Sequence, residues 1–474
     1  MSPVVLWTDA LIGLLLLVAA AAAWYGRRNR LLREAWRRVG QSRSGMAAAV
    51  VLACFVAVGL ADSIHYRPKL EAAGAKGASA YSAEVESLLD RLAAGLRAHG
   101  EKTYSAPFAT RLYAKETVER PDGSQVRDYP RLVHGGAHLK DEAARNADVA
   151  FRAAEGLAVA FLAWLAASVA VARRIARREG CGASAAWWRI WSGETAFAWN
   201  AVLASAGLVM LAAFPLAFLA GHYHVLGTDK VGQDVLLLSL KSVRTALVIG
   251  TLTTLVMLPF AVGLGILAGY AGGWIDDLIQ YLYTTLNSIP GVLLIAASVL
   301  MMQVMIDTHP QWFATAAERS DARLLALCAI LGVTSWTGLC RLLRGETLKL
   351  RELEYVEAAR AFGVPAARIM LRHVLPNLMH LVMIAMVMDF SGLVLAEAVL
   401  SYVGIGVDPN TYSFGTMINA ARLELSREPV VWWSLAAAFL FMLALVLSAN
   451  LVADAVRDAF DPRLAGRVRR LSAA

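Results

Sequence analysis

Nine apolar stretches, each about long enough to cross a bilayer, constrain the fold of this chain more than any other feature. A segment inside the hydrocarbon core finds no water partner for its backbone, so it must satisfy its own hydrogen bonds as a helix. The stretches lie near residues 4–25, 46–64, 153–172, 197–220, 243–271, 280–304, 323–341, 378–403 and 431–453. With 58% hydrophobic residues and a mean hydropathy of +0.53, the chain has the composition of a multi-span membrane protein. We therefore predict an all-α polytopic membrane protein.

Two groups of arginines predict the orientation of these helices. Residues 26–44 contain seven arginines and one acidic residue. A second group follows the third stretch, at Arg173, Arg174, Arg177 and Arg178. Basic residues beside membrane spans favour the cytoplasmic side. The N-terminus and residues 65–150 are therefore expected outside, and nine crossings place the residues near 360 and the C-terminus in the cytoplasm.

Two of the stretches have unusual features. Pro290 and Gly291 interrupt the stretch at 280–304, yet its length predicts one crossing helix. The first stretch has no basic segment before it and no small-residue cleavage site before Arg27. We therefore expect an uncleaved membrane anchor rather than a removable signal peptide.

A polar loop rich in small residues lies between the seventh and eighth apolar stretches. Residues 352–362 are good helix formers, and Gly363 suits the left-handed end of a helix. Pro365 fits the first turn of a second short helix, where its missing N–H removes no hydrogen bond. Pro376 is expected to bend the chain where apolar sequence resumes.

The surface of this loop suits contact with a partner protein. Glu357 and Arg360 lie three residues apart, on neighbouring parts of one helical face. Ala358 and Ala359 leave that surface smooth enough for close approach. An ordinary solvated helix-turn-helix between two spans is the alternative interpretation.

The spacing of the loop resembles the EAA loop of ABC importer permeases. That motif has Glu-Ala-Ala, three residues, Gly, nine residues, a usually apolar position, one residue and Leu-Pro. Here it runs from Glu357 through Gly363 to Leu375 and Pro376, with His373 at the usually apolar position. The segment 372–377 looks like the version found in the dipeptide/oligopeptide branch of the family.

Four further segments resemble that branch, in the same order. They are His224–Val235, Gly269–Asp276, Leu400–Val407 and Asn450–Arg463. Val225 and Gln233 stand where the family usually has Pro and Arg. The last apolar stretch reads Ala-Ala-Ala-Phe at 436–439, where Pro-Gly is common.

The resemblance implies a six-helix permease core of the C-type subunit at residues 196–474, with the EAA-like loop at about 346–376. An extension with three additional spans precedes this core. Residues 1–64 hold two spans and a basic cytoplasmic loop, and residues 151–195 hold the third span and a cytoplasmic connector.

The segment between them, residues 65–150, is predicted to form a small periplasmic α/β insertion. Apolar residues recur at helical spacing at Val85, Leu88, Leu89, Leu92 and Leu96. Pro121–Ser124 has the composition of a turn between two strand-like runs. Two roles remain open for the insertion: a docking surface for an extracellular binding protein, or a small domain that only packs on the permease.

The resemblance also implies a function, that of the transmembrane subunit of an ATP-driven importer that forms the path for short peptides or similar small solutes. The sequence contains no Gly-x4-Gly-Lys-Ser/Thr phosphate loop. We therefore expect no enzyme activity and no directly bound cofactor, with ATP and Mg²⁺ held by partner subunits. The residues expected to couple to the ATPase are Glu357, Ala358, Ala359, Arg360, Gly363, Leu375 and Pro376.

The expected partners follow from the same resemblance. They are two ABC ATPase subunits, a homologous permease subunit, an extracellular or periplasmic substrate-binding protein and the lipid bilayer, without nucleic acid. The expected location is the bacterial inner membrane, with many crossings.

Two acidic residues lie inside the eighth apolar stretch, Asp389 and Glu397. An ionisable residue at the centre of a membrane helix costs about 2.5–3.5 kcal/mol on insertion scales, so such residues are functional candidates. We predict that one or both line the translocation path and contact amine or amide groups of a peptide. A polar contact between helices is the alternative, and for Glu397 also a position near the outer interface.

Other functions are less compatible with the sequence. A permease for a non-peptide solute, such as a nickel chelate, is the main alternative. A membrane-embedded enzyme would need paired acids, but Asp276–Asp277 has no DxxxD companion. A sensor built on residues 65–150 would need a cytoplasmic signalling domain. His222 and His224 lack a third ligand for a metal and are expected at the surface, and the four cysteines form no CxxC pattern.

Overall fold

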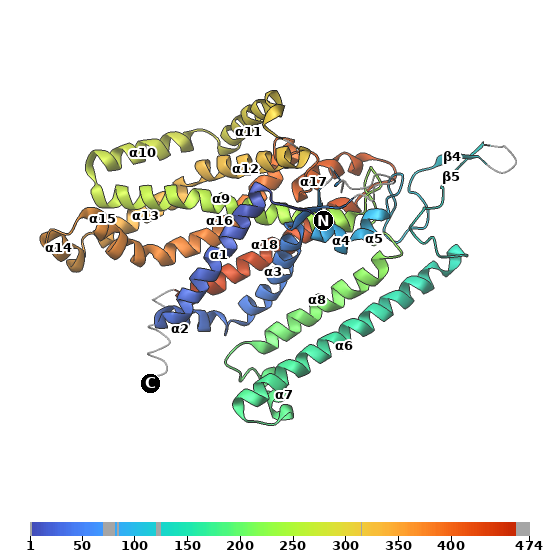
Figure 1. The fold of residues 1–474 in the computed structure, drawn as a ribbon, viewed down its shortest axis with the longest axis horizontal. Coiled ribbons are helices and arrows are strands. Elements are labelled where there is room, and N and C mark those ends of the chain that lie inside the picture. Colours follow the sequence, from blue (N-terminus) through green and yellow to red (C-terminus); the bar gives the residue numbers. More distant parts are fainter. Residues whose placement is uncertain (1, 70–80, 83–84, 120–124, 314, 461–474) are drawn as a thin grey trace, which may run out of the picture. The chain divides into compact units, whose positions relative to one another are not determined.

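The computed structural model describes residues 2–69, 81–82, 85–119, 125–313 and 315–460 (Figure 1). In that part of the chain, nine helical segments are long and apolar enough to cross a membrane. They are α1 (Trp7–Arg28), α3 (Arg43–Asp62), α6 (Arg145–Glu179), α8 (Trp199–Ala220), α9 (Val235–Ala271), α11 (Gly291–Thr308), α12 (Ala316–Ser335) with α13 (Thr337–Leu350), α16 (Leu375–Val403) and α18 (Trp433–Phe460). The predicted all-α class is confirmed.

The chain divides into two compact units. Among the described residues, the first unit contains those of 2–5, 37–245 and 412–452, and the second contains those of 6–36, 246–411 and 453–460. Helix α9 begins in the first unit and continues into the second. The domain boundaries expected from the sequence stay predictions.

A long helical hairpin is the main feature of the first unit. Helices α6 and α8 lie side by side and are joined through the short helix α7 (Ala183–Ser192), as Figure 1 shows. Gly180 and Gly193 end α6 and α7 with φ of 68° and 80°, a left-handed conformation that glycine adopts without strain. Ile190 of α7 is fully buried against Ala172 and Leu203, which closes the turn of the hairpin.

Residues 65–150 contain short strands and short helices. β2 (His65–Arg67) pairs antiparallel with β1 (Ser2–Val4) and with β3 (Glu86–Ser87). A capping box between Ser87 and Asp90 starts α4 (Leu88–Leu92), which α5 (Ala94–Ala98) follows. β4 (Glu116–Glu119) and β5 (Gln125–Asp128) form an antiparallel pair. The turn predicted at 121–124 lies outside the described residues.

Two buried apolar clusters hold the second unit together. The larger one joins α9, α13 and α16 to α10 (Gly273–Ser288), and its members include Ala261, Tyr283 and Leu343. The smaller one joins α9, α11 and α12 around Leu252 and Leu327. Two shorter α-helices remain: α17 (Phe414–Arg422) lies in the first unit, and α2 (Arg30–Val39) runs from the second unit into the first.

The bounds predicted for the crossing at 280–304 are wrong, because the candidate span there is α11 alone. Helix α10 ends at Ser288 and α11 begins at Gly291, with Ile289 in an extended conformation (φ −93°, ψ 131°). A residue before proline is pushed out of the helical region by the proline ring, and Pro290 has no N–H to continue the hydrogen-bond ladder. The predicted span is therefore two helices.

Helix α1 of the N-terminal extension is attached to α12 of the second unit by a buried polar contact. The backbone N–H of Thr8 donates to Asp321 Oδ2 at 3.1 Å, and the Thr8 hydroxyl donates to Asp321 Oδ1. Thr8 is fully buried and Asp321 nearly so. Leu11 and Ile12 pack beside them, so α1 is an integral part of this unit.

Candidate functional site

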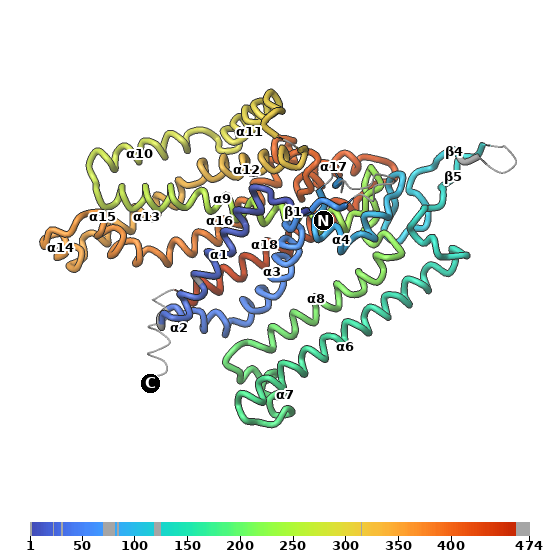
Figure 2. The backbone as a smooth tube through the Cα atoms, in the orientation of Figure 1, coloured from blue at the N-terminus to red at the C-terminus, as the bar shows by residue number. Residues whose placement is uncertain are grey.

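The EAA-like loop forms a compact helical element between α13 and α16 (Figure 2). It contains α14 (Glu354–Ala361), α15 (Ala366–Ile369) and a π-helical turn at Met370–Val374. The π turn leads directly into α16, so helical backbone continues from Ala366 to Val403. The second short helix expected from the sequence is therefore the first turn of a long one.

Gly363 ends α14 as predicted. Its φ of +74° lies in the left-handed region, and its N–H donates to the Arg360 carbonyl at 3.0 Å. The N–H of Val364 donates to the Ala359 carbonyl at 3.1 Å. These two hydrogen bonds form a Schellman motif, which satisfies the last carbonyls of the helix and fixes the direction of the following chain.

The two prolines of the loop are accommodated without a break in the chain. Pro365 is the N-cap of α15, one position earlier than expected, and its carbonyl accepts from Arg368 N and Ile369 N. Pro376 cannot donate to the carbonyl four residues earlier. The wider π turn comes directly before Pro376, and in it the N–H of Leu375 donates to the Met370 carbonyl. The bend expected at Pro376 is therefore replaced by a local change of helix type.

The underside of the loop is fixed to the apolar core. Val356, Ile369 and Val374 are 0–2% exposed and belong to the same cluster as Leu343 of α13. Ala359 and Val364 are half-buried against that cluster. Three buried anchors from three turns hold the loop as one body, which favours rigid-body movement over local deformation.

The opposite surface of the loop is open. Glu357, Ala358 and Arg360 are exposed, and the Phe362 ring is 87% exposed. Among the described residues, the side chains of Glu357 and Arg360 have no ion pair or hydrogen bond with this chain. An exposed aromatic ring beside two unpaired charges is typical of a protein contact surface.

An open hollow of about 570 Å³ adjoins this surface. Its lining is basic and apolar and consists of Pro365, Ala367, Arg368, Leu371, Arg372 and Pro376. Leu375, by contrast, is turned toward the apolar core. The predicted coupling residues therefore divide into a contact surface (Glu357, Ala358, Arg360, Pro376) and a supporting set (Ala359, Gly363, Leu375).

An ion pair close to this loop was not predicted. Arg344 of α13 donates to both carboxylate oxygens of Asp276 in α10, with Nε–Oδ1 at 2.5 Å and Nη2–Oδ2 at 2.7 Å. Arg351 donates to the carbonyl of Gly269 at 3.3 Å. Two partners 68 residues apart leave no local signal in the sequence.

The two acidic residues of α16 lie in different surroundings. Asp389 is half-buried, and its carboxylate has no hydrogen bond or ion pair within the described ranges. Glu397 is 1% exposed and accepts a hydrogen bond from the Ser401 hydroxyl at 2.7 Å. Their place on a translocation path stays a prediction.

One sequence-based expectation about histidines is wrong. His224 is 2% exposed, not a surface residue, and its Nδ1 lies 2.8 Å from Asp234 Oδ2. The reason is tertiary, because residues of the 65–150 insertion cover it. In the part of the chain that the structure describes, no cluster of His, Cys, Asp or Glu has metal-binding geometry.

A family profile and the individual relatives of this chain all describe membrane components of transport systems. Residues 261–466 match the profile of the family described as "Binding-protein-dependent transport system inner membrane component". The oligopeptide transport system permease protein OppC of Mycobacterium bovis is 32% identical over 242 residues, which cover 51% of this chain and 77% of that protein.

Two further relatives have the same coverage of this chain. The glutathione transport system permease protein GsiD of Pectobacterium atrosepticum is 33% identical over 51% of this chain and 73% of its own length. The dipeptide transport system permease protein DppC of Bacillus subtilis is 28% identical over 51% and 69%. The matched residues include the EAA-like loop, and the described part of the chain has nine candidate spans. With this degree of identity, the chain belongs to the family of binding-protein-dependent transport system inner membrane components.

Proposed function

We propose that this chain forms the translocation path of an ATP-driven importer for short peptides or similar small solutes. The relatives named for oligopeptide, dipeptide and glutathione transport support this substrate class. The EAA-like loop transmits the work of ATP hydrolysis, which takes place on partner subunits that hold ATP and Mg²⁺. The observation that carries this proposal is the loop itself, with a rigid underside and an open surface at Glu357, Ala358, Arg360 and Phe362.

The assembly proposed around this chain contains two ABC ATPase subunits, a homologous permease subunit and a substrate-binding protein. It lies in the bacterial inner membrane, with the EAA-like loop and the C-terminus in the cytoplasm and the N-terminus and the 65–150 insertion outside. The exposed arginines at the end of α6 support this orientation, since basic residues beside spans favour the cytoplasmic side.

Asp389 is the residue of α16 that we propose for contact with the solute. A carboxylate without a partner in a membrane helix is costly, so a cationic ligand or a wet cavity would stabilise it. The α-ammonium group of a peptide has the matching charge. We place Glu397 second, because Ser401 already satisfies one of its oxygens.

Co-purification with an ATPase tests the coupling role. Ala358→Trp places a bulky ring on the open surface of α14, and we expect it to abolish both ATPase association and uptake while the protein still inserts. Ala94→Trp, at an exposed alanine of α5, is the matched control and should change neither. Undiminished association and uptake with Ala358→Trp would refute the coupling role.

Uptake measurements test the substrate class. Vesicles containing the complete transporter should accumulate labelled tripeptides when the binding protein and ATP are present. Asp389→Asn should weaken uptake of peptides with a free amino terminus more than that of N-acetylated peptides. Accumulation of a nickel chelate without peptide uptake would assign the chain to the non-peptide alternative.

A further inference from the structure

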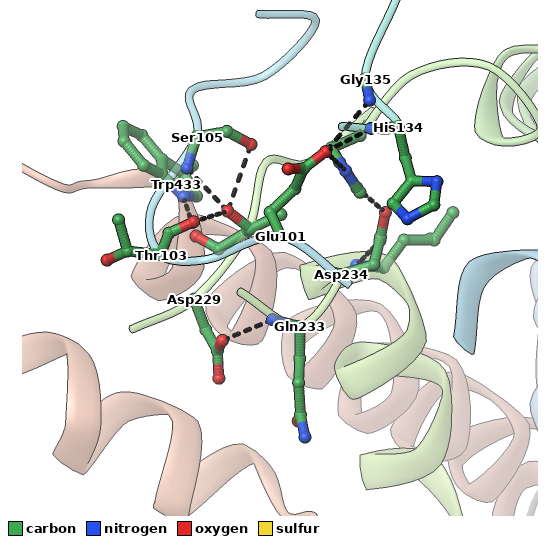
Figure 3. Close-up of polar contacts among 12 residues, drawn as sticks. Glu101, Thr103, Ser105, His134, Gly135, Asp229, Gln233, Asp234 and Trp433 are labelled. Carbon is green, nitrogen blue, oxygen red and sulfur yellow. Dashed lines mark hydrogen bonds and ion pairs between the residues drawn. The ribbon is translucent and has the colours of Figure 1, made fainter. Parts of the chain in front are cut away.

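Three consecutive backbone amides donate to the carboxylate of Glu101 in the insertion, and Figure 3 labels two of these donors, His134 and Gly135. The N–H groups of Val133, His134 and Gly135 donate to its carboxylate at 3.0, 2.8 and 3.2 Å. The Glu101 side chain is 2% exposed. A carboxylate that is buried in this way stays ionised because several donors stabilise its charge.

His224 lies between Glu101 and a second carboxylate. Its Nε2 is 3.5 Å from Glu101 Oε1, an ion-pair distance, and its Nδ1 is 2.8 Å from Asp234 Oδ2. Burial alone would lower the pKa of this imidazole, but the two carboxylates outweigh burial and raise it to about 9. Burial alone would raise the pKa of the Glu101 carboxyl group. The contact with His224 and the three backbone amides outweigh burial and lower this pKa to about 2. At neutral pH these groups therefore form a buried ion network.

Asp234 connects this network to helix α9. Its Oδ1 accepts the N–H of Leu236 at 2.8 Å, in the first turn of the helix. A carboxylate at this position satisfies a free amide of the helix start and interacts favourably with the helix dipole. The contacts thus run from Glu101 through His224 and Asp234 to α9.

A second ion pair attaches the insertion to α9 two turns further on. Lys241 Nζ lies 2.7 Å from Asp90 Oδ1, and both side chains are largely buried. Ser87 donates to Asp62 Oδ1 at 2.7 Å and caps the helix that carries Asp90. Burial alone would raise the pKa of Asp90, but the contact with Lys241 lowers it. The insertion therefore supplies the counter-charge for a lysine of α9.

Backbone contacts bring the two segments close together. Glu101 N donates to the Gly232 carbonyl at 2.9 Å, and Thr228 N donates to the Ser105 carbonyl at 3.1 Å. Gly232 has a φ of +80°, and a Cβ there would lie 1.8 Å from the Glu101 carbonyl oxygen. Trp433 donates from its indole N–H to the Thr228 carbonyl at 3.0 Å (Figure 3).

We propose that the insertion is a clamp on the start of α9, and that Glu101 and Asp90 are positioning residues for transport. Buried ion pairs contribute little net stability compared with apolar packing, but they fix one geometry. Helix α9 continues to Ala271, and its residues Ala261, Ile266 and Ala268 belong to the cluster that anchors the EAA-like loop. The clamp therefore acts on a helix whose later residues also pack against the EAA-like loop.

This proposal rests on the proposed import function and differs from both roles left open by the sequence. A docking surface would change the apparent affinity for the binding protein. A domain that only packs on the permease would change neither affinity nor rate. A clamp changes the maximal uptake rate and leaves the affinity for the binding protein unchanged.

The test compares Glu101→Gln with Glu116→Gln in proteoliposomes containing the complete transporter. Glu116 pairs with Lys102 at 2.7 Å on the exposed side of the same insertion, so it is the matched control. We expect Glu101→Gln to lower the maximal uptake rate about tenfold. It should also accelerate hydrogen exchange at the amides of Val133–Gly135. The half-saturating concentration of binding protein should not change, and the control should behave as the wild type.

A charge exchange at the second ion pair keeps the test decisive if Glu101→Gln fails to fold. Asp90→Lys and Lys241→Asp should each slow uptake, and their combination should restore at least part of the rate. A raised half-saturating concentration of binding protein, or faster hydrogen exchange with unchanged uptake, would overturn the clamp. Absence of uptake by the wild type would instead refute the import function, while the hydrogen-exchange comparison would still test the clamp.

Discussion

The backbone N–H of Val364 donates to the carbonyl oxygen of Ala359 across Gly363, at 3.1 Å. This hydrogen bond reverses the chain at the end of α14 and directs it into α15. Both residues also pack against the apolar core, so the turn and the anchoring of the EAA-like loop depend on each other. The left-handed φ of Gly363 makes this arrangement possible.

Gly363→Ala should therefore loosen the loop. No heavy atom lies within 4 Å of a Cβ built at this position, so the effect comes from the backbone alone. A left-handed conformation costs a non-glycine residue about 1–2 kcal/mol. We expect faster hydrogen exchange at the Val364 amide and reduced uptake. Gly338→Ala, in helix α13 and also without close neighbours, is the control and should be neutral or stabilising.

Asp276→Asn should destabilise the second unit by breaking its ion pair with Arg344. Hydrogen bonds to charged groups contribute about 1.5–3 kcal/mol, and this pair makes two of them while half-buried. We expect a lower midpoint of thermal unfolding in detergent. Asp277→Asn, at the exposed neighbouring acid, should leave the midpoint unchanged. Equal effects of the two substitutions would show that the ion pair is not what stabilises this region.

Thr8→Val should weaken the attachment of α1 to α12. The side chain keeps its shape but loses the hydroxyl that donates to Asp321, and the carboxylate remains buried. We expect a loss of about 1.5–3 kcal/mol. It should be detectable as faster proteolysis between α1 and α3. Thr308→Val, where the hydroxyl bonds only within its own helix and the next residue, should have little effect.

The clamp should weaken at alkaline pH. The pKa of His224 is raised from 6.5 to about 9 in the folded protein, so its stabilising contribution is complete below pH 6.5. That contribution falls between pH 6.5 and 9 and is lost above about 9. Glu101 acts in the opposite direction, because its lowered pKa gives a contribution that is lost only as pH falls from 4.5 toward 2.

Hydrogen exchange at the amides of Val133–Gly135, corrected for the intrinsic rate at each pH, measures this dependence. We expect protection to fall between pH 7 and 9.5 in the wild type. His224→Gln should remove the step. His99→Gln is the control and should leave the fall in protection unchanged. Burial and the neighbouring His134 lower the pKa of His99, so this histidine does not titrate in the alkaline range. A wild-type protection factor that does not change over this range would contradict a charged His224.

The helical class could be predicted from the sequence because apolar length and glycine or proline chemistry act locally. The left-handed turn at Gly363 needed only the residue type and its place after a helix-forming run. The same local rules explain the break at Pro290 and Gly291, which apolar length by itself does not reveal.

Contacts between distant residues were decided by the tertiary structure alone. Three contacts show this: Arg344 with Asp276, Thr8 with Asp321, and His224 with Glu101. Their partners are 68, 313 and 123 positions apart in the sequence. Each pair consists of ordinary charged or polar residues whose partners become known only when the chain is folded. Burial makes a partner necessary at these contacts, because a charge or polar group removed from water is costly unless the fold brings a partner to it.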